Sequence, residues 1–383
     1  MIKIEKKLNC SGCTACYSIC PVNAIEMIED NEGFKYPKID EEKCIKCELC
    51  NKICPIESKY ISSNQKPKMY AAYSLDEKNK LESSSGGLFT ELAKVILKEN
   101  GVVFGAGYDN DMNVVSKYVE KEEELITLKG SKYVQADMEN SYRKIKQFLQ
   151  EDRKVLFVGT PCQVAGLNKY LQKQYANLYT VDLVCHGVPS PKVYRKYIEA
   201  KQKVYKINNI SFRDKTKGWN KYSLKIDFKN GKTYKNLGSD DMYIKGFLSN
   251  IFLRPSCYDC KFSKVPRYAD ISLGDFWGVE NKYTEFSDDK GTSLILVNNN
   301  KGQEIFEKIR HTLYYKEDCD LDYAIKTNPC ICGSVKEPEI RKEFFEDIDN
   351  LEINKLLNKY IPKQKFLSKV KNKGLTIVRK IIK

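Results

Sequence analysis

The sequence predicts a multidomain protein of the α+β and α/β classes, in which a small cysteine-rich unit precedes a mixed-sheet α/β domain. Two observations predict this organisation. Residues 1–60 contain two copies of one cysteine pattern, and matching cysteines lie 34 positions apart (44 − 10). After a polar stretch at residues 58–68, strand-like and helix-like segments alternate, which is typical of an α/β sheet with some antiparallel strands.

Each copy of the cysteine pattern has the form C-x₂-C-x₂-C-x₃-C-P, the ligand run of bacterial two-cluster ferredoxins. One tight loop provides three thiolates to a 4Fe–4S cubane, and the fourth cysteine binds the other cluster. A zinc knuckle or a disulfide framework is the alternative, but zinc sites usually pair two C-x₂-C units. The predicted ligands are Cys10, Cys13, Cys16 and Cys54 (the first cysteine site) and Cys44, Cys47, Cys50 and Cys20 (the second cysteine site).

Within this predicted two-cluster ferredoxin fold, we expect a short helix at residues 22–27 and a hairpin strand at residues 33–39. Further on, apolar residues recur with strand or helix spacing; Leu88, Leu92 and Ile96, for example, form one helical face. Up to residue 204, the expected strands are 69–74, 102–104, 114–119, 155–158 and 178–184, and the expected helices are 87–98, 141–149 with Ser141 as its cap, 164–172 and 191–204.

Beyond residue 204, β-branched and aromatic runs predict strands at 207–212 and 222–228, and Asn230-Gly231 marks a hairpin turn. Two more strands, at 270–273 and 294–297, and a helix at 350–358 complete the expected elements. The expected domains are a ferredoxin-type domain at 1–60, two α/β domains at 68–150 and 151–335, and a helical, basic tail at 336–383.

The composition is that of a globular protein, and no stretch approaches 18 uninterrupted apolar residues. The N-terminus has no hydrophobic signal region, so we expect a cytoplasmic protein. In that compartment thiols stay reduced, and fifteen cysteines therefore indicate metal ligation and not disulfides.

The formal net charge of +14 is concentrated near the end of the chain. Residues 363–383 contain eight basic and no acidic side chains, so the rest of the chain carries only +6 (14 − 8). Nucleic-acid binding is therefore not predicted. The tail has near-helical apolar spacing, and it could lie on an anionic membrane, dock on an acidic partner, or pack on its own domain.

A second group of cysteines follows the predicted strands. Cys162 comes directly after strand 155–158, and Cys185 ends strand 178–184. If these strands are parallel neighbours, both thiols emerge at the carboxyl edge of one sheet, where ligands bind. Cys257 and Cys260 add a C-x₂-C pair. These four thiols (the third cysteine site) could hold a third cubane, a zinc ion or a redox-active dithiol, or they could be buried free cysteines.

Seven further motifs occur in one order between residues 70 and 280, and together they resemble the beta subunits of coenzyme F420 hydrogenases and dehydrogenases. The motifs are SSSGG at 83–87, GSKYVQ at 130–135, GTPCQ at 159–163, CHGVPS at 185–190, FRDK at 212–215, RPSCYDC at 254–260 and DISLGDFWG at 270–278.

The resemblance implies bound FAD, a third 4Fe–4S cluster at the third cysteine site, and electron transfer to or from a hydride carrier such as coenzyme F420. Serines and glycines that open a helix present free N–H groups and hydroxyls to a phosphate, although a simple helix cap with a surface lysine is the plainer interpretation. The flavin-lining residues that the resemblance implies are Ser84, Ser85, Gly86, Gly87, Gly130, Ser131, Lys132, Tyr133, Gln135 and Asp275.

His186 adjoins Cys185 and is the candidate catalytic residue, as a proton donor near the flavin or as a hydrogen-bond donor to a cluster; a structural histidine is the alternative. Four basic residues could meet FAD phosphates or an acidic carrier: Arg213, Lys215, Arg254 and Arg267. Three cysteines remain unassigned, and the C-x-C pair among them could replace a ligand of the third site: Cys319, Cys330 and Cys332.

These observations predict an iron–sulfur flavoprotein oxidoreductase that works with a redox partner protein or ferredoxin and a small-molecule hydride carrier. Two alternatives stay open. One is a non-catalytic electron-transfer subunit of a larger redox complex. The other is a reductase of another metabolite, such as a cell-surface sugar precursor, with the basic tail holding the protein at a membrane.

Overall fold

The computed structural model describes residue 4, residues 6–57 and residues 66–361. Its centre is an eight-stranded mixed sheet with strand order β13-β3-β12-β11-β7-β6-β4-β5. The strands β4, β6, β7 and β11 are parallel, and the others pair antiparallel. The sheet consists of β3 (Lys68–Ser74), β4 (Val102–Tyr108), β5 (Val114–Val119), β6 (Val155–Gly159), β7 (Leu178–Leu183), β11 (Ile271–Asp275), β12 (Ser293–Val297) and β13 (Leu313–Lys316). This is the mixed α/β sheet that the sequence predicts.

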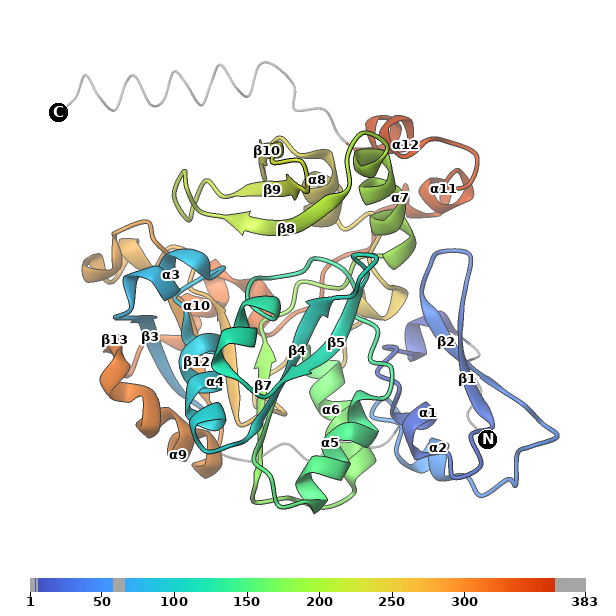
Figure 1. The fold of residues 1–383 in the computed structure, drawn as a ribbon, viewed down its shortest axis with the longest axis horizontal. Coiled ribbons are helices and arrows are strands. Elements are labelled where there is room, and N and C mark those ends of the chain that lie inside the picture. The colour runs from blue at the N-terminus through green and yellow to red at the C-terminus, as the bar shows by residue number, and fades with distance from the viewer. Residues whose placement is uncertain (1–3, 5, 58–65, 362–383) are drawn as a thin grey trace.

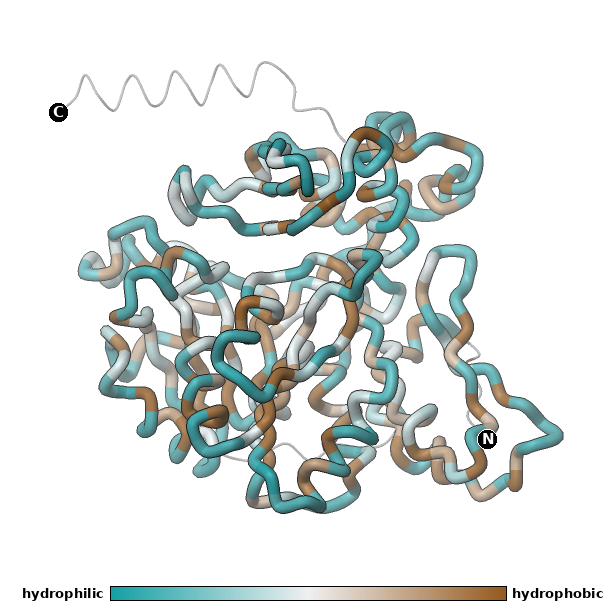
Figure 2. The backbone as a smooth tube through the Cα atoms, in the orientation of Figure 1, coloured by the Kyte–Doolittle hydropathy of each residue, from teal (hydrophilic) through white to brown (hydrophobic). Residues whose placement is uncertain are grey.

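Helices cover both faces of the central sheet (Figure 1). On one face, α4 (Leu88–Lys98) and α9 (Asn300–Ile309) share a core with the strands through Leu92 and Phe306. On the other face, α5 (Ser141–Gln150) and α6 (Pro161–Leu171) form a second core through Ile145 and Val164. Hydrophobic residues line the strands and the inner faces of the helices, and many outer loops are hydrophilic (Figure 2).

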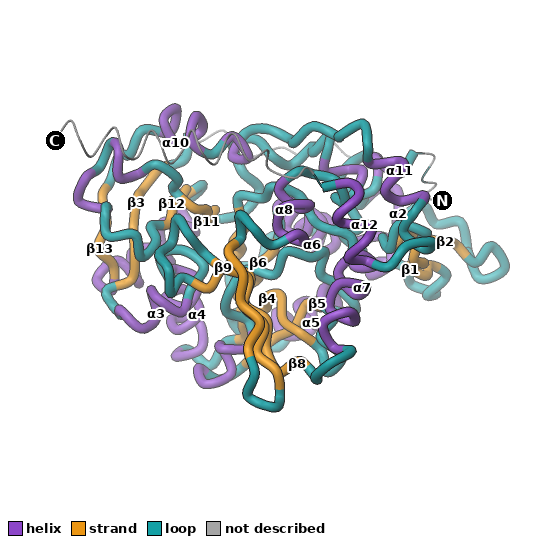
Figure 3. Tube along the Cα trace, turned by 90° about the horizontal axis from the view of Figure 1, so that it is seen from above, coloured by secondary structure: helices purple, strands orange, loops and turns teal. Residues whose placement is uncertain are grey.

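A three-stranded antiparallel sheet of β8 (Ile207–Asp214), β9 (Ser223–Phe228) and β10 (Thr233–Leu237) lies beside the central sheet. The predicted turn Asn230-Gly231 joins β9 to β10, and Gly231 has the positive φ of 82° that such turns require. The helices α7 (Pro191–Gln202), α8 (Met242–Leu248), α11 (Arg341–Glu346) and α12 (Ile353–Tyr360) share its core. Figure 3 shows β8 and β9 crossing over the central sheet.

The cysteine-rich unit contains α1 (Ala15–Ile19), β1 (Ile25–Glu29), β2 (Lys35–Ile39) and α2 (Leu49–Lys52), and it lies at the end of the molecule away from β13 (Figure 3). The helix expected at residues 22–27 is wrong, because β1 pairs there with β2 in five registered pairs. Six residues are too few for a stable isolated helix, so the hairpin pairing decides the structure.

Two helix starts also differ from the sequence prediction. Helix α6 begins at Pro161, three residues before the expected 164, because Thr160 and Gln163 form a capping box. Helix α5 is preceded by Asn140, so Ser141 is its first residue and not its cap.

The domain boundary expected at residue 150 separates two stretches that both contribute strands to the central sheet. The predicted basic helix beyond residue 361 lies outside the described residues. No helix in the described part of the chain is long and apolar enough to span a membrane.

Candidate functional site

The first cysteine site comes together as the crossed pattern predicts. Cys10, Cys13 and Cys16 from the first run and Cys54 from the second line one small cavity. Burial, with smaller contributions from the neighbouring thiols of Cys10 and Cys54, raises the pKa of the Cys13 thiol to about 12. Iron binding requires the deprotonated thiolates, so a bound metal would have to compensate their negative charge at this buried site.

The second cysteine site lies closer to the surface. Cys47 is exposed, whereas Cys20, Cys44 and Cys50 are half-buried. The Sγ atom of Cys20 accepts a hydrogen bond of 3.2 Å from the backbone N–H of Ala24. Cys20 and Cys50 pack against the apolar cluster that also contains Cys16 and Cys54 of the first site. Of the two ferredoxin-type sites, the second is therefore the more accessible to an external electron donor or acceptor.

The third cysteine site forms at the carboxyl edge of the central sheet. β6 and β7 are parallel neighbours, as expected, and they place Cys162 in the first turn of α6 and Cys185 just beyond β7. Cys257 ends the short 3₁₀ helix η3 (Pro255–Cys257), and Cys260 follows three residues later. All four cysteines line one pocket. The sheet topology thus brings together four thiols from three separate stretches of the chain.

The thiols of the third site interact electrostatically with one another. Burial, together with the neighbouring thiol of Cys260, raises the pKa of Cys162 to about 11 and that of Cys257 to about 12. Burial also raises the pKa of Cys185, and the other three thiols add to this effect. The hydroxyl of Thr160 lies 3.1 Å from Cys162 Sγ, and the Val188 N–H donates to Cys257 Sγ at 3.4 Å.

Within the described residues, no group of three or more His, Cys, Asp or Glu side chains is arranged to hold a metal ion as it stands. A cubane sets a different requirement, because its four thiolates bind four separate irons and need not converge on one point. The first and third cysteine sites each supply four neighbouring, buried or half-buried thiols without a disulfide. These donor sets fit a 4Fe–4S cluster.

The first and third sites are neighbours. The Cys162 thiol contributes to the raised pKa of Cys13, after burial and the closer thiols. Helix α1 contacts α6, where Gly166 faces Cys13. A Cβ atom on Gly166 would lie 2.9 Å from Cys13 Sγ, so the missing side chain permits this close approach. The first and third cysteine sites therefore meet where α1 packs against α6.

The two segments expected to line a flavin also come together. The backbone N–H of Ser131 donates a 2.7 Å hydrogen bond to Ser84 Oγ. The N–H of Gly86 donates to Ser293 Oγ at 3.0 Å, and Gly87 precedes α4 with a φ of 91°. Gly130 has open space where a Cβ would lie. Residues 84–87 and 130–131 thus share one region at the start of α4.

A buried arginine connects Asp275 and Tyr133 to this region. Arg213 Nη1 donates to Asp275 Oδ2 at 2.9 Å and to the Tyr133 hydroxyl at 3.2 Å. Its Nε and Nη2 atoms are buried and have no hydrogen-bond partner. Lys215 Nζ donates to the carbonyl of Ser85 at 2.8 Å. Because buried donors normally have partners, the two unpaired Arg213 nitrogens fit an anionic or carbonyl group of a bound cofactor.

Two of the predicted flavin residues point elsewhere. Lys132 Nζ donates to the carbonyls of Leu128 and Lys129 at 2.9 and 2.8 Å, so it closes the end of the 3₁₀ helix η2 (Glu122–Thr127). Gln135 Nε2 donates to the Ser11 carbonyl, and its Oε1 accepts from Arg254 Nη1 at 3.0 Å. Gln135 therefore lies against the first cysteine site and not against residues 84–87.

His186 lines the pocket of the third cysteine site. The Asn250 amide donates through Nδ2 to the Lys336 carbonyl, so its Oδ1 accepts from His186 Nε2 at 2.7 Å. That assignment leaves His186 Nδ1 as an acceptor, 3.7 Å from Cys330 Sγ. Burial lowers the pKa of His186, which favours the neutral imidazole.

The unassigned cysteines separate into three environments. Cys330 lies next to His186, and its thiol pKa is raised by burial and by Cys260, so it borders the third site. Cys332 is exposed, and Cys319 is buried in a separate apolar cluster. Sequence spacing alone did not indicate that Cys330, and not Cys332, approaches the third site.

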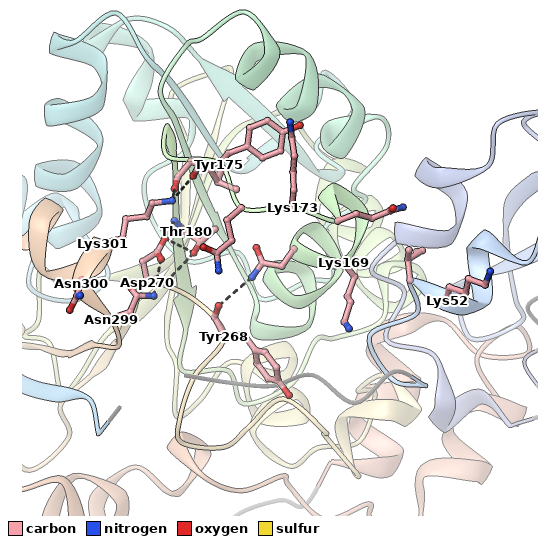
Figure 4. A pocket seen from close by; sticks show the side chains of 15 residues that line it. Lys52, Lys169, Lys173, Tyr175, Thr180, Tyr268, Asp270, Asn299, Asn300 and Lys301 are labelled. Carbon is pink, nitrogen blue, oxygen red and sulfur yellow. Dashed lines mark hydrogen bonds between the residues drawn. The ribbon is translucent and has the colours of Figure 1, made fainter. Parts of the chain in front are cut away.

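A large open depression lies between α2, α6, the start of β7 and α9 (Figure 4). Several of its polar groups bind neighbouring groups of the depression: Lys301 donates to the carbonyls of Tyr175 and Leu178, and Asp270 accepts from Thr180. Because it lies at the amino end of β7, it is opposite to the strand ends that carry the thiols.

Two family models match the chain. Residues 9–58 match the 4Fe–4S dicluster domain, and residues 152–319 match the family described as the C terminus of the coenzyme F420 hydrogenase/dehydrogenase beta subunit. The class of protein is therefore an iron–sulfur electron-transfer protein related to F420-dependent oxidoreductases. The chain joins a segment that matches the dicluster model to a segment that matches the F420 hydrogenase/dehydrogenase beta subunit model. The predicted resemblance is confirmed, and so is the iron–sulfur interpretation of the doubled pattern.

Two curated relatives differ in length from this chain. The coenzyme F420-dependent sulfite reductase of Methanocaldococcus jannaschii is 26% identical over 349 residues, which are 87% of this chain and 51% of the relative. An uncharacterized polyferredoxin-like protein of the same organism is 39% identical over 57 residues, 13% of this chain and 34% of its own length. The chain spans about half the length of the first relative.

Among solved structures, a chain of the F420-reducing NiFe hydrogenase complex from Methanosarcina barkeri, studied by xenon derivatization, is similar with a TM-score of 0.49 and 19% identity. The alignment covers 71% of this chain and 92% of that chain. The third cysteine site, Arg213 and Asp275 all lie within the matched segment 152–319, whereas residues 84–87 and 130–135 lie outside it.

Proposed function

We propose that this protein transfers electrons between two ferredoxin-type 4Fe–4S clusters, a third 4Fe–4S cluster and FAD, and from there to or from a hydride carrier such as coenzyme F420. The observation that carries the proposal is the third cysteine site, whose four thiols lie in one pocket next to Cys13 of the first site. Clusters exchange single electrons and hydride carriers exchange pairs, and a bound flavin supplies the chemistry that joins them.

The roles of the residues follow from their contacts. In this proposal, residues 84–87 and 130–131 receive the flavin with hydroxyl and N–H groups. The free Nε and Nη2 atoms of Arg213 bind an anionic or carbonyl group of it, and Asp275 orients Arg213. His186 holds a proton on Nε2 through Asn250 and accepts at Nδ1, so it could relay a proton beside the third cysteine site. We also propose that the protein acts in the cytoplasm.

Anaerobic purification with iron, acid-labile sulfide and flavin counted per chain tests this proposal. Three clusters require about twelve irons, at four per cluster. We expect FAD with these irons, and reduced ferredoxin should then reduce coenzyme F420. Removal of the third site by Cys162→Ser should lower the count to about eight and leave the ferredoxin-type clusters. A wild-type chain with about eight irons and no flavin would contradict the proposal.

A second candidate is an electron-delivering subunit for a separate reductase. The observation that favours it is that the chain spans about half the length of the F420-dependent sulfite reductase. In that case the purified chain would hold its clusters and flavin and oxidise reduced coenzyme F420 with an artificial acceptor. Reduction of a physiological acceptor would appear only after a partner protein is added.

A further inference from the structure

Among the described residues, Arg254 is the most completely buried arginine, with 1% of its surface exposed. It directly precedes η3, which ends at Cys257 of the third cysteine site. Its own backbone is fixed there, because its N–H donates to the Val188 carbonyl at 3.0 Å. The side chain crosses from the α/β unit into the ferredoxin unit and reaches the first cysteine site.

Within the described residues, the Arg254 guanidinium donates its hydrogen bonds to the ferredoxin unit and to Gln135. Nε donates to the Cys10 carbonyl at 2.7 Å, and Nη2 lies 3.5 Å from Cys10 Sγ. Nη2 also donates to the Lys35 carbonyl at 3.0 Å, and Nη1 donates to Gln135 Oε1 at 3.0 Å. The ring of Tyr36 lies 4.4 Å from the guanidinium carbon. Five neighbouring groups thus fix its position.

None of these partners is a carboxylate. Three other buried arginines each pair with an acid: Arg213 with Asp275, Arg267 with Asp182, and Arg341 with Glu32. In the described part of the chain, Arg254 has no such ion pair. A buried charge without a counter-charge is costly. The negative charge of cluster-bound thiolates at the neighbouring cysteine sites would compensate the charge of Arg254.

Arg254 acts on both cysteine sites. It contacts Cys10 of the first site through Nη2 and the carbonyl. At the third site, the Arg254 carbonyl accepts from the Cys257 N–H at 2.9 Å, and Val188, whose carbonyl accepts from the Arg254 N–H, donates its own N–H to Cys257 Sγ at 3.4 Å. Arg254 therefore lies between the first and third cysteine sites, which exchange electrons in the proposed function.

We propose that Arg254 is a positioning residue whose positive charge, held between the first and third cysteine sites, raises the reduction potential of the cluster at the first site. This inference rests on the proposed function, because it requires a cluster there. One electron enters the cluster on reduction, and no bond forms or breaks. A nearby cation and a hydrogen bond to a ligand sulfur both stabilise the more negative, reduced state.

The test is a redox titration of the anaerobically purified, full-length protein, followed by electron paramagnetic resonance, for the wild type, Arg254→Gln and Arg254→Lys. We expect Arg254→Gln to lower the equilibrium constant for reduction of one ferredoxin-type cluster at least tenfold, which is about 59 mV for one electron. Arg254→Lys keeps the charge and should recover at least half of this shift.

Arg143→Gln is the matched control. Arg143 also holds the ferredoxin unit through neutral acceptors, since it donates to the carbonyls of Tyr17 and Ser18 and to Asn23. It is only half-buried, and in the described part of the chain no hydrogen bond joins it to a sulfur atom. Its loss should therefore shift the potentials by less than half as much as the loss of Arg254.

The outcomes separate the two proposals. A wild-type chain without clusters would contradict the proposed function itself. A wild-type chain with clusters, whose potentials are the same in Arg254→Gln, would contradict only the role of Arg254. If Arg254→Gln loses a cluster, the Arg254→Lys variant distinguishes the two explanations. Iron retained in Arg254→Lys, with a reduction potential near that of the wild type, supports the role of the charge. The same loss of iron in Arg254→Lys overturns it.

Discussion

Two lysines near the start of α4 have side-chain pKa values well below the ordinary value of 10.5. The pKa of Lys132 is lowered to about 7 by burial and by the nearby Lys117, and the pKa of Lys215 is lowered to about 7 by burial and by Arg213. Both ammonium groups donate to backbone carbonyls. Their first role is therefore to hold loops near the start of α4, and neither is a freely available phosphate ligand.

Lys132 gives a prediction for the pH dependence of stability. Between pH 7 and its ordinary pKa of 10.5, the unfolded chain still binds this proton and the folded chain has lost it. The free energy of unfolding therefore rises with pH in that window, by at most about 1.4 kcal/mol per pH unit for one group. Urea unfolding of the apoprotein at pH 7, 8 and 9 should show a smaller rise for Lys132→Met than for the wild type. Lys78→Met, at an exposed lysine, is the control, and equal slopes for Lys132→Met and the wild type would refute the assignment.

At the scale of elements, the start of α6 links helix capping to the third cysteine site. The Thr160 N–H donates to Gln163 Oε1 at 2.9 Å, and Cys162 lies between these two residues. The capping box thus fixes the backbone that carries one of the four thiols. Parallel pairing of β6 with β7 then brings this turn next to Cys185.

Gln163→Leu tests this link. It removes one arm of the capping box and should lower the stability by about 1 kcal/mol. We expect it also to lower the iron content from about twelve toward about eight per chain, at four irons per cluster, because Cys162 loses its fixed position. Asn299→Ala removes the cap of α9, far from the cysteines, and should cost similar stability with no loss of iron. Equal iron in both variants would show that the capping box does not support the site.

At the scale of the whole molecule, the ferredoxin unit is attached to the rest of the chain by polar side chains at several separate places. Arg341 of α11 binds Glu32 in the β1–β2 hairpin through two nitrogens, at 3.1 and 2.5 Å. Arg254 and Arg143 bind the cysteine loops. Phe34 of the hairpin also packs in the core that contains α7 and α11. These attachments keep the first and third cysteine sites adjacent.

Breaking the Arg341–Glu32 pair should loosen this attachment. Both side chains are largely buried, at 7% and 13% exposure, so Arg341→Met leaves a carboxylate without a partner and should cost about 3–5 kcal/mol. The double variant Arg341→Met/Glu32→Leu should recover most of that loss, since it leaves no unpaired charge. Chemical denaturation of the three proteins measures both effects. A double variant as unstable as the single one would contradict this explanation.

Local spacing along the chain encodes one part of this protein. The ferredoxin motifs, the alternating strands and helices, and the positions of Cys162 and Cys185 at strand ends could all be predicted, because ligand spacing and hydrophobic period are local properties. The helix at residues 22–27 was predicted wrongly for the same reason: a local pattern does not contain the β2 strand that pairs there.

Contacts between residues that are far apart in the sequence depend on the tertiary structure. Cys257 and Cys260 lie in the same pocket as Cys162 and Cys185, and Cys330 lies beside His186. Gln135 contacts the first cysteine site and not residues 84–87. Arg254 likewise lies between two cysteine sites only in the folded chain. Strand order and packing set these contacts, and both depend on pairing between segments that lie far apart in the sequence.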